Sequence, residues 1–424
     1  MKTMLILSGS DPTRFAGYAP IGIRDELERH GVKTAFITKY KPKYDRYPNV
    51  LYYYSGVWAL LKRIIHRFRV VIVKIVVRNP HKKQLLTDIF PFLPTMLPGR
   101  LRKMAKIKPD AILVFFMPGF VNYADLYVLY KYFKCKIIVS TPDMQPFTGL
   151  CHFSEGCSNF EYQCGRCHLI KSKSRYDVTW LLLMFKIMIS RNINLHGLCW
   201  TSEYEGYLAK SPIFDETKII RVPNLKSDRV NMRQPSKKEK NDIRNEFGIS
   251  ENDFVLLICA ANLGEKRKGV SDIVQAIDLV VTNGSIYNCL VIVTAGEGEL
   301  PQIPNVKRIV NLGFLFQEDL YKAYWLSDVH ISASKADVGP GTMVMALRCG
   351  VPVISYKTGT APERIEDGID GYLVDVNDIH GLAKRVQDFY ELNESIKEQW
   401  SRSAAYKSKA RRQDNWISNL VKAI

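Results

Sequence analysis

The chain has 424 residues, enough for two domains with separate cores, and its 46% hydrophobic and 24% charged residues are typical of globular proteins. The balance of 60 Lys and Arg against 42 Asp and Glu gives a formal net charge of +18. This charge indicates an acidic partner, namely a nucleic acid, an anionic membrane or a phosphorylated substrate, unless it serves solubility alone. Because no run of about 20 uncharged apolar residues is present, we expect no membrane-spanning helix.

The N-terminal half begins with an alternation of apolar strands and helices. The expected elements are a strand Met4–Ser8, a Gly-containing loop to Gly22, a helix Ile23–His30 and strands Thr34–Ile37, Ala111–Phe116 and Lys136–Ser140. The first apolar run is too short for a signal peptide and has the length of a buried strand. This order of elements predicts a doubly wound, parallel α/β sheet.

A basic and apolar stretch from Trp58 to Arg78 interrupts this alternation. Its apolar residues recur at helical spacing, and Lys, Arg and His occupy the other positions. The pattern suits a helix that lies in an anionic membrane interface. A core-facing helix with a solvated basic face, or a strand over Val70–Val77, would also fit it.

A cysteine-rich stretch follows the strand that ends at Ser140. It places four thiols within 17 residues, at Cys151, Cys157, Cys164 and Cys167. Their spacing, with a Cys-x2-Cys pair closed by Gly165, predicts a structural zinc site without an open catalytic position. His152 and His168 flank the cluster as substitute ligands, and the alternative is a loop with four free thiols. Nine cysteines without a signal peptide indicate a reducing compartment.

The second half begins after a polar, basic linker that starts near Lys226. The expected strands are Phe254–Ala260, Asn288–Thr294, Asp328–Ser332 and Val351–Tyr356, and the expected helices are Val270–Val281, Glu318–Leu326, Met343–Cys349 and Ile379–Tyr390. A strand about every 35 residues with helices between them predicts a second parallel sheet. Residues 396–424 form a basic amphipathic segment at the end of the chain.

Two loops of this half have the composition of an anion site. The loop after the strand Phe254–Ala260 contains Arg267 and Lys268, which suit a phosphate, although a solvated basic loop is the simpler meaning of such a run. The loop after Ser332 carries one carboxylate, Asp337, and then the run Gly339, Pro340 and Gly341. Thr342 is expected to be the N-cap of the next helix. A loop and a helix N-terminus at the end of a parallel strand are what a nucleotide pyrophosphate needs.

In order and spacing, the segment 332–374 resembles the donor site of retaining glycosyltransferases with the GT-B fold, of the family 4 type. That family places two glutamates eight positions apart, for the donor hexose and for the nucleotide ribose, and here these positions are Asp337 and Met345. The resemblance implies that Arg267 and Lys268 contact the donor diphosphate, which such enzymes neutralise without Mg²⁺. It also assigns Glu363 to the donor site, where we place Gly17 from the N-terminal loop as well.

The cysteine-rich stretch is similar to a polysaccharide-synthesising subgroup of the same family. That subgroup has His-Asp-Met-x-Pro-x-Thr-Gly-x-Cys, and here the His-Asp pair is Pro142-Asp143. Asp143 is therefore the one residue that the resemblance assigns to the vicinity of the reacting sugar.

Together these features predict two Rossmann-like doubly wound domains facing across a cleft. The expected parts are residues 1–225 on the acceptor side, with a cysteine-rich insertion at about 143–170, residues 226–395 on the donor side, and residues 396–424 crossing back to the first domain. The expected activity is retaining transfer of a sugar from a UDP- or GDP-linked donor to a growing, lipid-linked glycan, with Asp337 and Asp143 in catalytic roles. No cofactor is expected for catalysis, and zinc only as a structural ion.

The expected location is cytoplasmic, peripheral at the inner face of the membrane, because the acceptor would be attached there. A non-catalytic homologue that binds a glycan or a partner is the alternative, motivated by Met345 and Pro142. A zinc-containing nucleic-acid binder would explain only the charge and the cysteines, so we expect no nucleic-acid partner.

Overall fold

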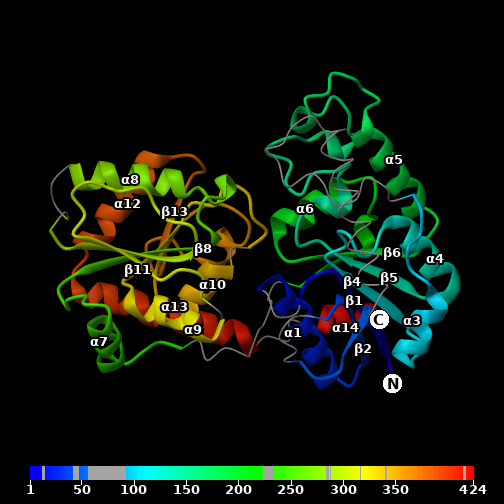
Figure 1. Cartoon of the computed structure of the whole chain (residues 1–424), viewed down its shortest axis with the longest axis horizontal. Helices are drawn as coiled ribbons and strands as arrows, with labels where there is room; N and C mark the ends of the chain where they lie inside the picture. Colours follow the sequence, from blue (N-terminus) through cyan, green and yellow to red (C-terminus); the bar gives the residue numbers. More distant parts are fainter. Residues whose placement is uncertain are drawn as a thin grey trace. The chain divides into compact units, whose positions relative to one another are not determined.

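The computed structural model describes residues 1–11, 15–41, 47–55, 92–222, 233–282, 286, 288–315, 317–339, 341–413 and 417–424. The contacts within the chain separate it into two units, Met1–Ser227 with Asn415–Ile424 and Asp228–Asp414. Each unit is a parallel sheet covered by helices (Figure 1). The stretch Trp58–Arg78 and most of the linker lie outside the described residues.

The sheet of the first unit is parallel throughout, with the strand order β3-β2-β1-β4-β5-β6-β7. Its strands are β1 (Thr3–Ser8), β2 (Lys33–Tyr40), β3 (Val50–Tyr54), β4 (Ala111–Phe115), β5 (Lys136–Ser140), β6 (Leu195–Cys199) and β7 (Ile219–Arg221). The chain goes first to one side of β1 and then, from β4 onward, to the other. The direction of strand order therefore reverses between β1 and β4.

Helices connect most of these strands, as a parallel sheet requires. They are α1 (Phe15–Arg29), α3 (Pro98–Ala105), α4 (Tyr123–Phe133), α5 (Val178–Ser190), α6 (Ser202–Lys210) and, from the C-terminus, α14 (Ser418–Ala423), which packs on β7. The prediction of a loop to Gly22 is wrong, because α1 begins at Phe15 and contains Gly17. The helix also continues through Pro20, which lies inside it.

The sheet of the second unit has the strand order β10-β9-β8-β11-β12-β13 and is also parallel. Its strands are β8 (Phe254–Asn262), β9 (Leu290–Glu297), β10 (Arg308–Asn311), β11 (Val329–Ser332), β12 (Val353–Tyr356) and β13 (Gly371–Val374). Its helices are α7 (Lys237–Glu246), α8 (Val270–Thr282), α9 (Gln317–Leu326), α10 (Gly341–Arg348), α11 (Ala361–Arg364), α12 (Ile379–Glu391) and α13 (Glu394–Gln413). The prediction of two doubly wound parallel sheets is confirmed.

Two apolar clusters cover the two faces of this second sheet. One joins α8 and α12 to the sheet, and the other joins α9 and α10 to its opposite face (Figure 1). Alternate residues of β8 divide between them, with Leu256 and Ile258 in the first cluster and Val255 and Leu257 in the second. This alternation follows from the two-residue period of a strand, and it fixes the register of the central strand.

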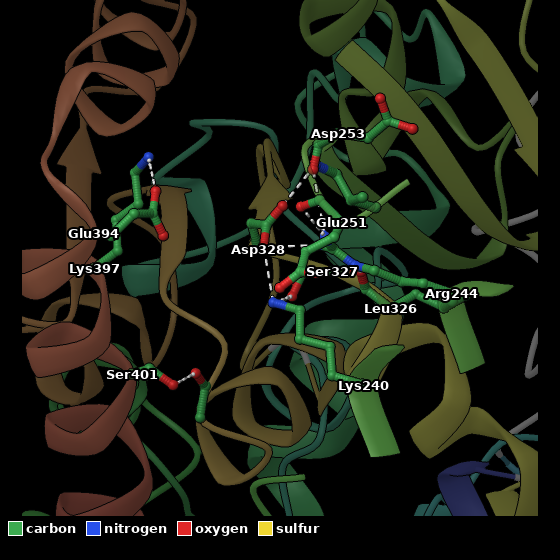
Figure 2. Close-up of polar contacts among 12 residues, drawn as sticks. Lys240, Arg244, Glu251, Asp253, Leu326, Ser327, Asp328, Glu394, Lys397 and Ser401 are labelled. Atoms are coloured by element: carbon green, nitrogen blue, oxygen red, sulfur yellow. Dashed lines mark hydrogen bonds and ion pairs between the residues drawn. The ribbon is translucent and has the colours of Figure 1, made fainter. Parts of the chain in front are cut away.

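A buried carboxylate attaches α7 to the sheet of the second unit. Asp328, just before β11, accepts from Lys240 Nζ at 2.7 Å and from Arg244 Nη2 at 2.8 Å, as Figure 2 shows. Its other oxygen accepts from the backbone N–H of Val255 at 2.8 Å. Arg244 also donates from Nε to the carbonyl of Leu326 at 2.9 Å. The first helix after the linker is thus held by charge-assisted hydrogen bonds to the strands that position the candidate site.

The end of the chain is divided between the units. The helix α13 belongs to the second unit, where Lys407 pairs with Asp370 at 3.1 Å. In the first unit Asn419 Nδ2 donates to the carbonyl of Arg221 at 3.2 Å. In the part of the chain that the structure describes, no helix is both long and apolar enough to cross a membrane.

Candidate donor and acceptor sites

The loops after β8 and β11 meet at the carboxyl edge of the second sheet, where strand order changes direction. From β8 the chain proceeds to β9 and β10 on one side, and from β11 to β12 and β13 on the other. In open parallel sheets this switch point is where ligands bind, because neighbouring loops separate there and leave backbone groups accessible. The sequence-predicted residues Arg267 and Lys268 lie in the first loop, and Asp337 lies in the second.

These three residues form one ion cluster. Lys268 Nζ lies 2.6 Å from Asp337 Oδ2, and Arg267 Nη1 lies 3.1 Å from the same oxygen. All three side chains are less than 20% exposed. Burial alone would raise the pKa of Asp337, but the charges of Lys268 and Arg267 outweigh burial and hold the pKa below its usual value. The carboxylate therefore stays ionised and offsets one of the two positive charges. Glu265 Oε1, which lies 2.9 Å from Arg267 Nη2, offsets the other.

Backbone hydrogen bonds join the two loops beside this cluster. Lys335 donates its N–H to the carbonyl of Arg267 at 2.8 Å, and Arg267 Nη1 donates to the carbonyl of Ala336 at 2.8 Å. Gly269 has a φ of +63°, and a Cβ there would lie 2.0 Å from the carbonyl oxygen of Ala333. Only glycine permits this approach without displacing the neighbouring loop.

The glycine run and the start of α10 lie next in the chain. Gly339 donates its N–H to Asp337 Oδ1 at 3.2 Å. Because α10 begins at Gly341, Thr342 lies inside its first turn and the prediction that Thr342 is the N-cap is wrong. Pro340 lies outside the described residues. The first turn of α10 carries backbone N–H groups without a partner in the helix, which favours an anion near Gly341.

The remaining donor-site predictions have different outcomes in the structure. Glu363 is half-buried in α11, at the end of β12, one strand away from Asp337. Met345 is 6% exposed and belongs to the apolar cluster between α10 and the sheet. Its side chain therefore contributes to the core of the unit and does not face a ribose. Gly17 is buried within α1 of the first unit.

In the first unit, Asp143 and His152 form a pair that the sequence did not predict. Asp143 Oδ2 lies 2.8 Å from His152 Nδ1, and the two side chains are 8% and 14% exposed. Asp143 Oδ1 accepts the N–H of Gln145, so both carboxylate oxygens are engaged. We expected His152 beside the cysteines as a substitute ligand, but it turns toward Asp143, at the carboxyl end of β5. An Asp and a His nine residues apart form no motif that would have predicted this pair from the sequence.

The four clustered cysteines lie together in the same segment. Cys151, Cys157, Cys164 and Cys167 line one small cavity, and His168 lies on its wall. They form no disulfide. Among the residues that the structure describes, no three His, Cys, Asp or Glu side chains already have the arrangement of a metal site.

Comparison with known proteins finds a family match within the second unit. Residues 255–391 match the family described as Glycosyl transferases group 1. The second unit thus carries the sequence pattern of this family. N-acetyl-alpha-D-glucosaminyl L-malate synthase of Bacillus anthracis is 32% identical over 155 residues, which are 35% of this chain and 39% of that protein. The chain therefore matches well under half the length of this curated relative.

Solved structures extend the likeness to both units. Sucrose-phosphate synthase from Thermosynechococcus elongatus has a TM-score of 0.66 at 13% identity, with 100% of this chain and 97% of that chain covered. HepE of Anabaena, in complex with UDP and glucose, has a TM-score of 0.62 at 14% identity, with both chains covered completely. At such low identity the likeness shows the fold alone, and the prediction of a GT-B fold is confirmed.

Proposed function

We propose that the protein is a retaining glycosyltransferase that moves a hexose from a nucleoside diphosphate to a growing surface glycan. The observation that carries this proposal is the cluster of Arg267, Lys268 and Asp337 at the switch point of the second sheet. It lies within the segment that matches the glycosyltransferase family, and the similar HepE structure holds UDP and glucose. The non-catalytic alternative differs from this proposal in one measurable property, which is turnover.

On the donor side, the diphosphate would replace Asp337 as the partner of the two cations. A donor diphosphate carries a charge of about −2, and Arg267 and Lys268 offset that charge through hydrogen bonds from charged donors. The backbone N–H groups at Gly341 and Thr342 would add the contribution of the helix N-terminus. Asp337, once released from the cations, would accept a hydroxyl of the donor hexose. Gly339 and Pro340 would shape this loop, and Glu363 would line it from α11.

In the reaction, the bond between the anomeric carbon and the diphosphate oxygen would break while the acceptor oxygen forms a bond to the same face of that carbon. The departing diphosphate would take up the bonding electrons and accept the proton of the acceptor hydroxyl. No protein nucleophile is needed, because the acceptor itself attacks on the face that the diphosphate leaves. On the acceptor side, we assign Asp143 and His152 to the positioning of the acceptor hydroxyl. Asp143 would fix the orientation of the imidazole through Nδ1.

Calorimetry with UDP and with GDP in the presence of EDTA tests the donor side. We expect binding without a divalent cation, because the cluster supplies two cations and the donor motif lacks a pair of carboxylates for Mg²⁺. Loss of all binding on chelation would contradict this assignment. The transfer itself is tested with a labelled nucleotide sugar and a lipid-linked oligosaccharide acceptor. Asp337→Asn should then reduce turnover more strongly than nucleotide binding.

The surface-glycan acceptor implies work beside a membrane, and we propose that residues 58–78 supply the attachment. The support is the sequence pattern of an apolar stripe with Lys and Arg on the other side, together with the net charge of +18. Flotation with anionic vesicles should show binding that weakens as salt rises. Charge reversal at Arg63, Arg67 and Lys74 should release the protein, and indifference of the wild type to anionic vesicles at low salt would contradict the proposal.

A non-catalytic glycan-binding homologue is the second candidate. It is favoured by Met345, which occupies the family's ribose-binding position but lies in the core, and by Pro142 in place of a histidine. The Asp143–His152 pair argues against it. The imidazole of His152 lies beside Asp143 and could replace the histidine that is missing at position 142. Binding of donor and acceptor without any labelled product would establish this second function.

A further inference from the structure

The four clustered cysteines surround a cavity that fits one ion. The cavity has a volume of about 20 Å³, close to the minimum that holds a single water molecule. It is too small for an organic ligand. Four sulfur atoms around a space of this size have the number and the chemistry of a tetrahedral thiolate site.

A backbone N–H group points at one of these sulfurs. Gly149 donates its N–H to Cys164 Sγ at 3.3 Å. Such a bond stabilises a thiolate more than a thiol, because hydrogen bonds to charged acceptors are stronger.

The turn between Cys164 and Cys167 is held closed by the backbone. Gly165 has a φ of +121°, and a Cβ there would lie 2.1 Å from the carbonyl oxygen of Arg175. Arg166 follows with a φ of +47°, in the left-handed region. Its N–H donates to the carbonyl of Ser174 at 2.7 Å. This arrangement brings the two sulfurs of the Cys-x2-Cys pair to the same side of the turn.

The apolar cluster beside the cysteines is small. Among the described residues it contains Leu150, Leu169 and Leu182, with partly buried neighbours that include Cys151 and Cys167. Between residues 148 and 177, all of which are described, the only regular elements are two three-residue 3₁₀ turns. Small segments of this kind are normally stabilised by disulfides or by a metal, and the four cysteines form no disulfide.

We propose that Cys151, Cys157, Cys164 and Cys167 bind one Zn²⁺ as four thiolates. Four S–H bonds break and release four protons to the solvent, four Zn–S bonds form, and the water molecules bound to free Zn²⁺ leave. The site then has a net charge of −2. Because the described residues hold no metal-binding arrangement as they stand, the cysteine side chains would reorient on binding.

A buried cation lies close enough to the cysteine cluster to offset part of the negative charge of the proposed site. The charge of Lys186 acts on both Cys151 and Cys164. Lys186 is itself 3% exposed and donates to the carbonyls of Gln145 and Thr148 at 2.6 and 2.7 Å.

The metal would also fix the Asp143–His152 pair, an extension that rests on the proposed function. The ligand Cys151 immediately precedes His152, and Thr148 Oγ1 donates to the carbonyl of Cys151 at 2.6 Å. Met144, next to Asp143, donates its N–H to the carbonyl of His152 at 2.8 Å. Because Cys151 and His152 are adjacent in the chain, we expect a change at the sulfur to affect the position of the imidazole. We therefore assign the zinc a positioning role for the acceptor side.

Elemental analysis of the purified full-length protein should give close to one zinc per chain. After removal of zinc with a thiol-directed reagent, addition of Co²⁺ to the reduced protein should produce the intense sulfur-to-cobalt absorption of a tetrahedral thiolate site. Cys157→Ser, at a half-buried position, should weaken Co²⁺ binding at least tenfold. The matched control Cys135→Ser, in the same unit but outside the cluster, should leave it unchanged.

Protein that contains no zinc and gives no sulfur-to-cobalt band in the reduced state overturns the proposal, as does an unchanged cobalt band in Cys157→Ser. Calorimetry with UDP separates this proposal from the proposed function. Zinc-free protein should still bind UDP through the second unit while its transfer rate falls. If UDP does not bind to any form of the protein, the glycosyltransferase proposal fails and the cobalt result stands by itself.

Discussion

The donor cluster of the second unit and the cysteine cluster of the first unit differ in the elements that hold their side chains in position. Arg267, Lys268 and Asp337 are held by loops between regular elements, and each loop begins where a buried parallel strand ends. The four cysteines lie in a segment with only short 3₁₀ turns between β5 and α5. A sheet therefore orients the first cluster, whereas no regular element orients the second.

This difference predicts that the donor cluster is most sensitive to backbone changes. Gly269→Ala forces a residue with a side chain into a left-handed conformation against the carbonyl of Ala333. We expect a loss of about 2–5 kcal/mol in the free energy of unfolding, from strain and overpacking together. Urea denaturation measures it. Gly368→Ala is the matched control in the same unit, because its φ of +78° is similar but a Cβ there meets nothing within 4 Å.

The control should lose only about 1–2 kcal/mol, the left-handed strain without the clash. Equal losses in the two variants would mean that the close approach of Gly269 to Ala333 contributes nothing. The two loops of the donor cluster would then be independent of each other. The contrast between a rigidly held donor cluster and the cysteine cluster would no longer be supported.

Acid should weaken the second unit through a buried histidine under the donor loop. His330 in β11 is fully buried, and burial lowers its pKa to about 4 from 6.5. Nδ1 lies 3.0 Å from the carbonyl of Leu257 and therefore carries a hydrogen. The unfolded chain takes up a proton below pH 6.5 while the folded chain does not, so stability falls as pH falls from 6.5 to 4. The loss should reach about 2–3 kcal/mol at pH 4.5.

Denaturation curves at pH 7.5 and 4.5 test this effect. His330→Asn retains a donor for Leu257 and is less stable at pH 7.5, because a smaller side chain leaves a cavity. Its stability should nevertheless fall less steeply with acid than that of the wild type, by the same 2–3 kcal/mol. Parallel pH curves for the two proteins would show that His330 does not govern the acid sensitivity.

The cations of the donor cluster should affect binding more than folding. Arg267→Ala removes one hydrogen bond from a charged donor, and we expect UDP binding to weaken by roughly 1.5–3 kcal/mol, measured by calorimetry. The matched control is Lys266→Ala, which changes an exposed neighbour in the same turn and should alter binding by less than about 0.5 kcal/mol. Equal effects of the two changes would mean that only the net charge of the loop matters.

The smallest effect should appear in the cysteine loop. Arg166 is exposed and has a φ of +47°, so Arg166→Gly should relieve left-handed strain and stabilise the metal-free segment by up to about 1 kcal/mol. Lys173→Gly, at a residue without a left-handed backbone in the same segment, should destabilise it slightly through the unfolded chain. Limited proteolysis of the metal-free protein compares the two, and faster cleavage of Arg166→Gly than of the wild type would contradict the argument.

The order of strands and helices in the second unit followed from sequence because β11 and β12 are apolar runs between glycine-rich turns. Elements with weaker local signals escaped prediction, such as β13, whose four residues begin with glycine. The start of α1 was misplaced because the glycines of this stretch suggested a loop, yet the helix contains Gly17 in the structure. Local sequence therefore predicted the element type correctly where the apolar period was strong, and incorrectly where glycines suggested a loop.

The chemistry of the donor site was likewise present in sequence, whereas its geometry was not. Arg267 and Asp337 are 70 positions apart, and a pattern cannot show that they form an ion pair. They meet because β8 and β11 are neighbours in the sheet, so that their carboxyl ends bring both loops to one edge. Only the tertiary fold shows that Met345 lies in the core. The side of a helix that faces the sheet is known only when its packing partners are known.

In the first unit, sequence by itself determined that four thiols lie at metal-binding spacing, because spacing is a property of the chain. Tertiary structure decided that all four line one cavity and that His152 turns away from them to Asp143. The physical reason is that an irregular loop has no repeating geometry from which side-chain directions follow. Such directions are fixed by hydrogen bonds and burial among distant residues, and these exist only in the folded chain.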